Sequence, residues 1–165
     1  MPESRVTETA LFLKPTRLVV TILLVLFLLA GIGVRLIDFQ DLPLDFAVTR
    51  QLHSYIMTRG IYYQMDTPAT NAIPGETRRF AIETGQSEPQ IEPPIMEYLV
   101  AFIYRVLGSE NMLVARFLSI LFWVIGGIPM FLLAKQITTI NGAFIALALY
   151  LFNPFVTIAS RSFQP

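Results

Sequence analysis

The sequence predicts an all-α integral membrane protein with about three transmembrane helices and a large outer loop that carries interfacial helices. Of its 165 residues, 54% are hydrophobic and only 15% are charged, whereas soluble domains carry about 25% charged residues. Long apolar runs recur along the chain, and a helix needs about 20 apolar residues to cross the hydrocarbon core of a bilayer. A long stretch rich in charged residues and proline separates the first two runs.

Net charge and cysteine content exclude several classes of function. The formal net charge is zero, which argues against a nucleic-acid partner, because such a partner requires a basic surface. The chain has no cysteine, so it has no disulfides, no thiolate chemistry and no zinc–thiolate site.

The three predicted transmembrane helices cover residues 18–34, 113–134 and 143–159. The first run is longer than the apolar region of a signal peptide, which is about 7–15 residues, and no small-x-small cleavage pattern follows it. We therefore expect an uncleaved anchor helix after a tail at residues 1–17. In the second run, the long side chain of Arg116 can extend to the membrane interface.

A shorter apolar run, about residues 94–107, is ambiguous. It follows Pro93 and Pro94, and it contains Glu97 and Arg105. A run of about 10–14 apolar residues is more typical of an interfacial or re-entrant helix than of a crossing. The three-crossing interpretation is favoured, and a fourth crossing here is the alternative.

The orientation follows from lysine and arginine residues beside the spans. Lys14 and Arg17 precede the first span, and Lys135 lies in the short turn before the third. With three crossings these residues share one side, which is then cytoplasmic. The outer loop at residues 35–112 and the segment 160–165 are then outside, in a multi-pass protein of the cell membrane.

The outer loop opens with a predicted amphipathic helix at about residues 45–59, and Gly60 is a suitable stop. The apolar face is predicted to lie on the bilayer and consists of Leu44, Val48, Leu52, Tyr55 and Ile56. The polar face carries Thr49, Arg50, His53 and Ser54. The stretch from Asp66 to Gln90 is rich in Pro, Gly, Thr and Glu, which is typical of a mobile loop.

Each polar residue of this loop has a structural interpretation beside a functional one. Asp45 can cap the helix or act in catalysis. Arg50 and Arg59 can anchor lipid headgroups, Tyr62 and Tyr63 can belong to an aromatic belt, and His53 can be solvated. Residue patterns alone therefore indicate a membrane protein with an amphipathic outer loop.

Taken in order, the motifs resemble those of the family 39 glycosyltransferases of the GT-C superfamily, which include protein O-mannosyltransferases and the aminoarabinose transferase of lipid A. The matching pieces are a first span, an acidic residue on an interfacial helix (Asp45–Gly60), a Pro-Pro helix (residues 93–98), and a span that begins with a small residue and arginine (Ala115-Arg116). Two positions differ: Phe46 stands where the family often has Glu, and Glu92 stands where it often has Lys.

The resemblance implies transfer of a sugar from a polyprenyl-phosphate donor to an acceptor hydroxyl at the outer face, as in an inverting glycosyltransferase. Asp45 matches the position of the general base. Arg50, Arg59 and Arg116 are the implied candidates for binding the donor phosphate, with Arg161 more remote. Glu92 and Asp45 together can hold a divalent metal ion, and His53, Tyr62 and Tyr63 are further candidates.

The resemblance also implies a longer enzyme, since the family usually continues from such a stretch into a second acidic motif and further spans. We expect the chain to be an N-terminal portion that is inactive alone, with membrane lipids and a C-terminal transmembrane region as partners. The alternative is a small non-enzymatic membrane protein, either an assembly or scaffold subunit or a transporter fragment.

Overall fold

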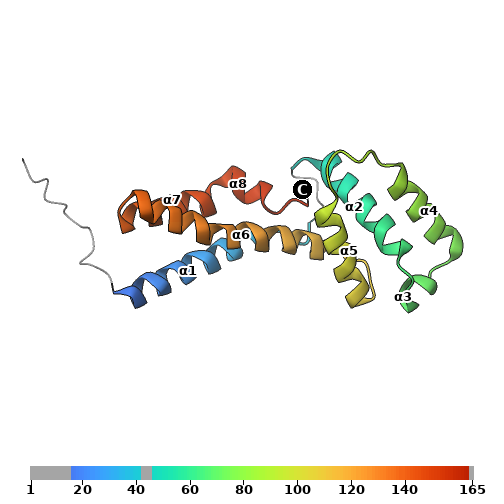
Figure 1. Cartoon of the computed structure of the whole chain (residues 1–165), viewed down its shortest axis with the longest axis horizontal. Coiled ribbons are helices and arrows are strands. Elements are labelled where there is room, and N and C mark those ends of the chain that lie inside the picture. Colours follow the sequence, from blue (N-terminus) through green and yellow to red (C-terminus); the bar gives the residue numbers. More distant parts are fainter. Residues whose placement is uncertain (1–15, 42–45, 164–165) are drawn as a thin grey trace, which may run out of the picture.

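The structure is a computed structural model that describes residues 16–41 and 46–163. Within these ranges all regular elements are helices, in two groups. The membrane bundle comprises α1 (Arg17–Arg35), α6 (Met112–Ile137), α7 (Ile140–Phe152) and α8 (Pro154–Ala159). The loop unit comprises α2 (Val48–Gln64), α3 (Pro68–Asn71), α4 (Gly75–Ser87) and α5 (Ile95–Leu107). Figure 1 shows the bundle along the long axis and the loop unit at one end of it. The predicted all-α class is confirmed.

Helices α1 and α6 are the two described helices that are long and apolar enough to cross a membrane. Each begins at a side chain that satisfies a free backbone N–H group of the first turn. The Thr16 hydroxyl accepts from the N–H of Val19 at 3.4 Å, and the Asn111 amide oxygen accepts from the N–H of Leu113 at 2.9 Å. Both caps are polar residues directly before an apolar run, so the local sequence sets both starting points.

The third predicted segment, residues 143–159, is not one continuous helix. Helix α7 ends at Phe152 and α8 begins at Pro154, because proline has no N–H group and disfavours helical backbone in the residue before it. Asn153 is accordingly extended, with φ −59° and ψ 125°, and its side chain accepts from the N–H of Val156. The prediction missed the Asn-Pro break.

The helices of the bundle pack closely through small residues. Gly31 of α1 and Gly127 of α6 both face Leu151 of α7, and a shared core forms where the three helices meet. Its buried members are Phe131, Ala134, Ala143, Leu147 and Leu151. At the end of α1, the guanidinium of Arg35 is fully buried. It donates to the Leu151 carbonyl at 2.9 Å and to the Ser160 hydroxyl at 2.6 Å, so it satisfies a carbonyl freed by the Asn-Pro break.

In the loop unit, α2 extends through the predicted stop at Gly60 and ends at Gln64. The glycine is used for packing, not for termination: a Cβ on Gly60 would lie 2.9 Å from the Cα of Gly85 in α4. Because neither residue has a side chain, the two helix backbones can approach each other closely.

The predicted mobile loop at residues 66–90 is wrong, because this stretch contains α3 and α4. Thr67 and Thr70 form a reciprocal capping box around α3, with Pro68 in the first turn. Helix α4 follows Pro74 and packs its Ala81 into the core of the loop unit. Composition suggested a loop, but caps and the Gly60–Gly85 contact give the stretch fixed helical structure.

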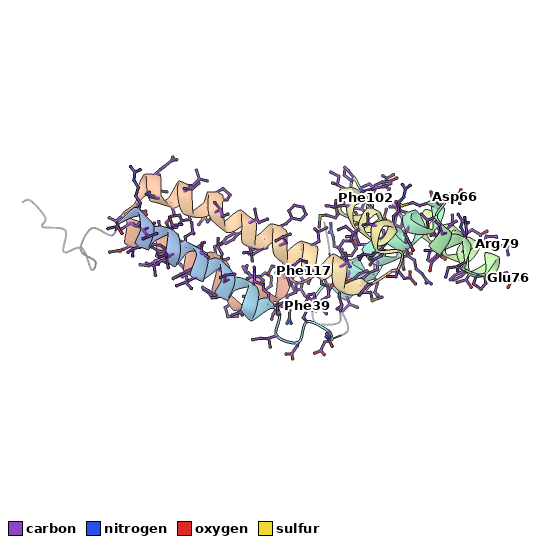
Figure 2. The ribbon with its side chains drawn as sticks, turned by 90° about the horizontal axis from the view of Figure 1, so that it is seen from below. Phe39, Asp66, Glu76, Arg79, Phe102 and Phe117 are labelled. Carbon is purple, nitrogen blue, oxygen red and sulfur yellow. The ribbon has the colours of Figure 1, made fainter. Side chains whose placement is uncertain are left out.

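Helix α5 is the amphipathic helix that the sequence predicted at about residues 94–107, and it ends at Gly108 with φ +69°. Its buried positions are Glu97, Val100, Ala101 and Tyr104, at the spacing of one helix face. The opposite face exposes large apolar side chains: Ile95, Tyr98, Phe102 and Val106. In Figure 2, the labelled Asp66, Glu76 and Arg79 lie at the end of the loop unit far from the bundle, while Phe39 and Phe117 lie at the junction.

Candidate functional site

A cavity of about 520 Å³ lies between α2, the connection after α4 and the first turn of α5. We call it the α2/α5 cavity. Its polar lining residues include Arg50, His53 and Ser54 from α2, Glu88 and Glu92 from the connection, and Glu97 from α5. Its apolar lining consists of Leu52, Ile56, Met57, Pro89, Ile91 and Pro94. Such a mixture is typical of a small-molecule site, in which apolar walls surround a few polar groups.

Two ion pairs attach the connection to α2. Arg50 pairs with Glu92, and Nδ1 of His53 lies 2.7 Å from Oε2 of Glu88. Arg50 and His53 are one helical turn apart and therefore neighbours on the surface of α2. The two pairs hold residues 88–92 along one wall of the cavity.

Two polar side chains on the floor of the cavity are buried and lack partners within the described residues. Glu97 is 2% exposed and Ser54 is fully buried, and neither Oε2 of Glu97 nor Oγ of Ser54 has a hydrogen-bond partner there. Burying a polar group without a hydrogen bond costs about 1–3 kcal/mol on the scale of protein mutations. Glu97 stands in the first turn of α5, where the helix dipole favours a carboxylate.

Of the predicted site residues, the structure brings Arg50, His53 and Glu92 together in this cavity. Asp45, the predicted general base, lies outside the described residues. The possible metal site at Asp45 and Glu92 therefore stays a prediction, and the residues described contain no group of three or more His, Asp or Glu residues placed to hold a metal ion.

The structure separates Arg59 from Arg50. They are nine positions apart on α2, which at about 100° per residue places them on opposite sides of the helix. Arg59 pairs with Glu110 at 3.0 Å and stacks over the ring of Tyr63. In this arrangement the two arginines cannot both bind the same phosphate group.

The remaining predicted residues serve packing. Tyr62 and Tyr63 are buried side by side in the core of the loop unit, with ring centroids 5.2 Å apart. Arg116 is 2% exposed and donates from Nη1 to the carbonyls of Phe39 and Asp41 at 2.8 and 2.5 Å. It does not extend to a lipid interface as predicted, because the backbone carbonyls of residues 39–41 provide acceptors within the protein.

The predicted faces of α2 are also only partly correct. Tyr55, expected on the bilayer face, is only 7% exposed, and Ser54, expected on the polar face, is fully buried. Helix α2 packs against both α4 and α5, so opposite sides of it are covered by protein. A periodicity argument with one buried face cannot describe a helix that lies between two others.

Sequence reasoning missed Glu88, Glu97 and Ser54 as site residues. Glu88 lies at the end of the stretch that was interpreted as a loop. Glu97 carried a usable signal, because it shares the 3- and 4-residue spacing of the buried face of α5 with Val100, Ala101 and Tyr104. A carboxylate at a core position of an amphipathic helix needs a partner or a function.

Over the described residues, the helices and the cavity together define an all-helical membrane protein, with a polar site beside a bundle that contains two candidate membrane spans. Residues 91–165 match the family described as dolichyl-phosphate-mannose-protein mannosyltransferase. This match confirms the predicted resemblance to the GT-C glycosyltransferases over these residues. It includes Glu92, Glu97, Arg116 and Arg161, while α2 lies before it. No curated protein and no solved structure matches the chain.

Proposed function

We propose that the chain forms the N-terminal part of a membrane glycosyltransferase that moves a sugar from a polyprenyl-phosphate donor to an acceptor hydroxyl. The family match over residues 91–165 carries this proposal. The α2/α5 cavity supports it, because a concave site lined by carboxylates and one guanidinium lies next to a helix bundle that suits an isoprenoid chain.

The proposed reaction needs a base and a stabilised leaving group. The acceptor oxygen attacks the anomeric carbon from the face opposite the phosphate, so the configuration inverts. The bond from the anomeric carbon to the phosphate oxygen breaks, and its electron pair leaves with the lipid phosphate. The acceptor proton passes to a carboxylate, for which Asp45 is the candidate.

The leaving phosphate gains negative charge, which a nearby cation stabilises. Among the predicted arginines, Arg50 is the one that lines the α2/α5 cavity. Its present partner is Glu92, and both side chains are partly exposed, so water and ligands can reach the pair. Arg59 and Arg116 are held by other groups and are weaker candidates.

We also propose that this chain retains the donor and does not turn it over by itself. The protein is placed in lipid nanodiscs and titrated with undecaprenyl phosphate, with phosphatidylglycerol as a control anion. Native mass spectrometry should show saturable retention of the polyprenyl phosphate and much weaker retention of the control lipid. Equal retention of both lipids would argue for general anionic-lipid binding and against the transferase. Turnover of a polyprenyl-phosphate sugar by this chain alone would overturn the expectation of inactivity.

A further inference from the structure

From Glu97 and Ser54 we infer that the α2/α5 cavity binds the sugar itself and selects a sugar that carries no negative charge. The inference rests on the proposed function and adds to it the part of the substrate that this site recognises. The lipid phosphate then lies at the edge of the cavity, beside Arg50, whose side chain is 47% exposed.

The charge of the lining disfavours a phosphate in the interior of the cavity, away from Arg50. Glu88, Glu92 and Glu97 contribute three carboxylates, and among the described lining residues the only guanidinium is that of Arg50. The pair Arg50–Glu92 is internally neutral. His53 faces Glu88, and Glu97 forms no ion pair within the described part of the chain. A phosphate would add further negative charge to an excess that already exists, and like charges repel strongly where water is scarce.

The unpartnered atoms match what a sugar offers. Oε2 of Glu97 accepts hydrogen bonds, and the hydroxyl of Ser54 both donates and accepts. Sugar hydroxyls can hydrogen-bond to each kind of atom, and a sugar ammonium group can also balance the charge of Glu97. A hydrogen bond to a charged group is stronger than one between neutral groups. Glu97 is therefore the residue that should dominate recognition.

The size and walls of the cavity also suit a sugar. Its volume of about 520 Å³ falls within the roughly 300–1,000 Å³ that is usual for small-molecule sites. Ile56, Met57 and Pro94 supply apolar surface for the C–H faces of a ring. Thus the apolar walls provide contact area for the sugar ring, and the buried polar atoms fix the orientation of the sugar.

The test uses the protein in nanodiscs and three soluble probes that differ in charge: mannosamine, methyl α-D-mannopyranoside and mannose 6-phosphate. Affinities are measured by ligand-observed NMR. We expect mannosamine to bind most tightly, the neutral mannoside more weakly, and mannose 6-phosphate not measurably. Equal or tighter binding of mannose 6-phosphate would overturn the inference.

Variants then assign the effect to the cavity. Glu97→Gln should weaken mannosamine binding about tenfold or more, the equivalent of a lost charged hydrogen bond, and should abolish its advantage over the neutral mannoside. Glu83→Gln is the matched control, because Glu83 pairs with Arg79 on the exposed surface of α4. Identical behaviour of the two variants would contradict the assignment. Ser54→Ala provides a second test if Glu97→Gln does not fold, and it should weaken the neutral mannoside severalfold.

Two outcomes separate this inference from the proposed function. Retention of undecaprenyl phosphate without the charge order among the sugars would leave the proposed function standing and refute the sugar site. The charge order without retention of undecaprenyl phosphate would support the sugar site and refute the polyprenyl-phosphate donor.

Discussion

Gly60 of α2 and Gly85 of α4 are in reciprocal backbone contact: a Cβ on either residue would lie within 2.9 Å of the other glycine's Cα. The contact joins the helix that carries Arg50 and His53 to the helix that leads into Glu88. The walls of the α2/α5 cavity therefore depend on two residues that have no side chains and do not line it.

Gly60→Ala should destabilise the loop unit. Alanine favours a helix over glycine by about 1 kcal/mol, but here its methyl group would overlap backbone, and overpacking typically costs about 1–3 kcal/mol. Circular dichroism during heating should show a lower midpoint than the wild type. Gly75→Ala is the control, because a Cβ at Gly75 meets nothing within 4 Å. A midpoint for Gly60→Ala at or above that of the control would contradict the close contact.

Arg35→Met should loosen the attachment of α1 to the region of the Asn-Pro break. The change removes the bonds to Leu151, Ser160 and Gly31, and each bond to a charged donor contributes about 1.5–3 kcal/mol. Arg35→Lys should recover little, because an ammonium group lacks the planar fork that reaches several acceptors. Thermal aggregation in detergent reports the loss. Wild-type stability in both variants would show that the hydrogen bonds of Arg35 contribute nothing to the stability of the bundle.

Alkaline pH should unfold the loop unit. Burial raises the pKa of Tyr55 to about 12, with the charge of Arg116 opposing the shift. Burial also raises the pKa of Tyr104, with smaller contributions from Tyr55 and Glu110. Because the folded pKa is raised above the usual 10, the stabilisation is complete below pH 10 and is lost as the pH rises through about 12.

Circular dichroism and absorbance at 295 nm should therefore change together in this alkaline range. Tyr55→Phe removes one of the ionising groups. The loss of helix with rising pH should therefore be less steep in this variant than in the wild type. Ionisation of all tyrosines near the ordinary value, with helix content unchanged, would contradict the role of these buried hydroxyls.

The predicted orientation is accessible to labelling, because the chain has no cysteine of its own. Gln136→Cys lies beside Lys135 in an exposed position, and Glu83→Cys is exposed on α4. An impermeant maleimide added to intact cells should label the second variant and not the first. Labelling of Gln136→Cys from outside would favour the four-crossing arrangement.

Asp45→Asn distinguishes catalysis from capping. In any chain that carries Asp45 and turns over a polyprenyl-phosphate sugar, loss of a general base should lower turnover about 10²–10⁴-fold. As a helix cap, asparagine serves about as well as aspartate. Turnover is measured with a polyprenyl-phosphate sugar, and donor retention is measured in parallel. Near-normal turnover would assign the base to another carboxylate.

The apolar helices were the predictable part of the fold. Runs such as residues 18–34 and 113–134 are long enough that composition alone identifies them, and α1 and α6 extend each by only one to three residues at either end. The break at Asn153 was missed because an apolar run was weighted above a single proline. Helix α4 was missed because its position depends on Gly60–Gly85 packing, a contact between distant parts of the sequence.

Only the more exposed residues of the candidate site could be predicted from the sequence. Arg50, His53 and Glu92, which line the cavity, were identified because charged residues beside membrane spans are costly unless they have a partner or a function. Ser54 and Glu97 were not, because their significance depends on being buried against a neighbouring helix. That burial results from α2 lying between α4 and α5, which no local periodicity encodes.

Four consecutive residues after α8 connect the two halves of the molecule. Ser160 binds Arg35, and Arg161 donates to the Ile37 carbonyl at 2.5 Å. Two residues further on, the N–H of Phe163 donates to Gln51, and its ring packs against Tyr55 with centroids 4.9 Å apart. A shift of α7 and α8 in response to bilayer thickness or lateral pressure would thus be transmitted directly to α2. The position of these bundle helices would then bear directly on α2, which forms one wall of the α2/α5 cavity.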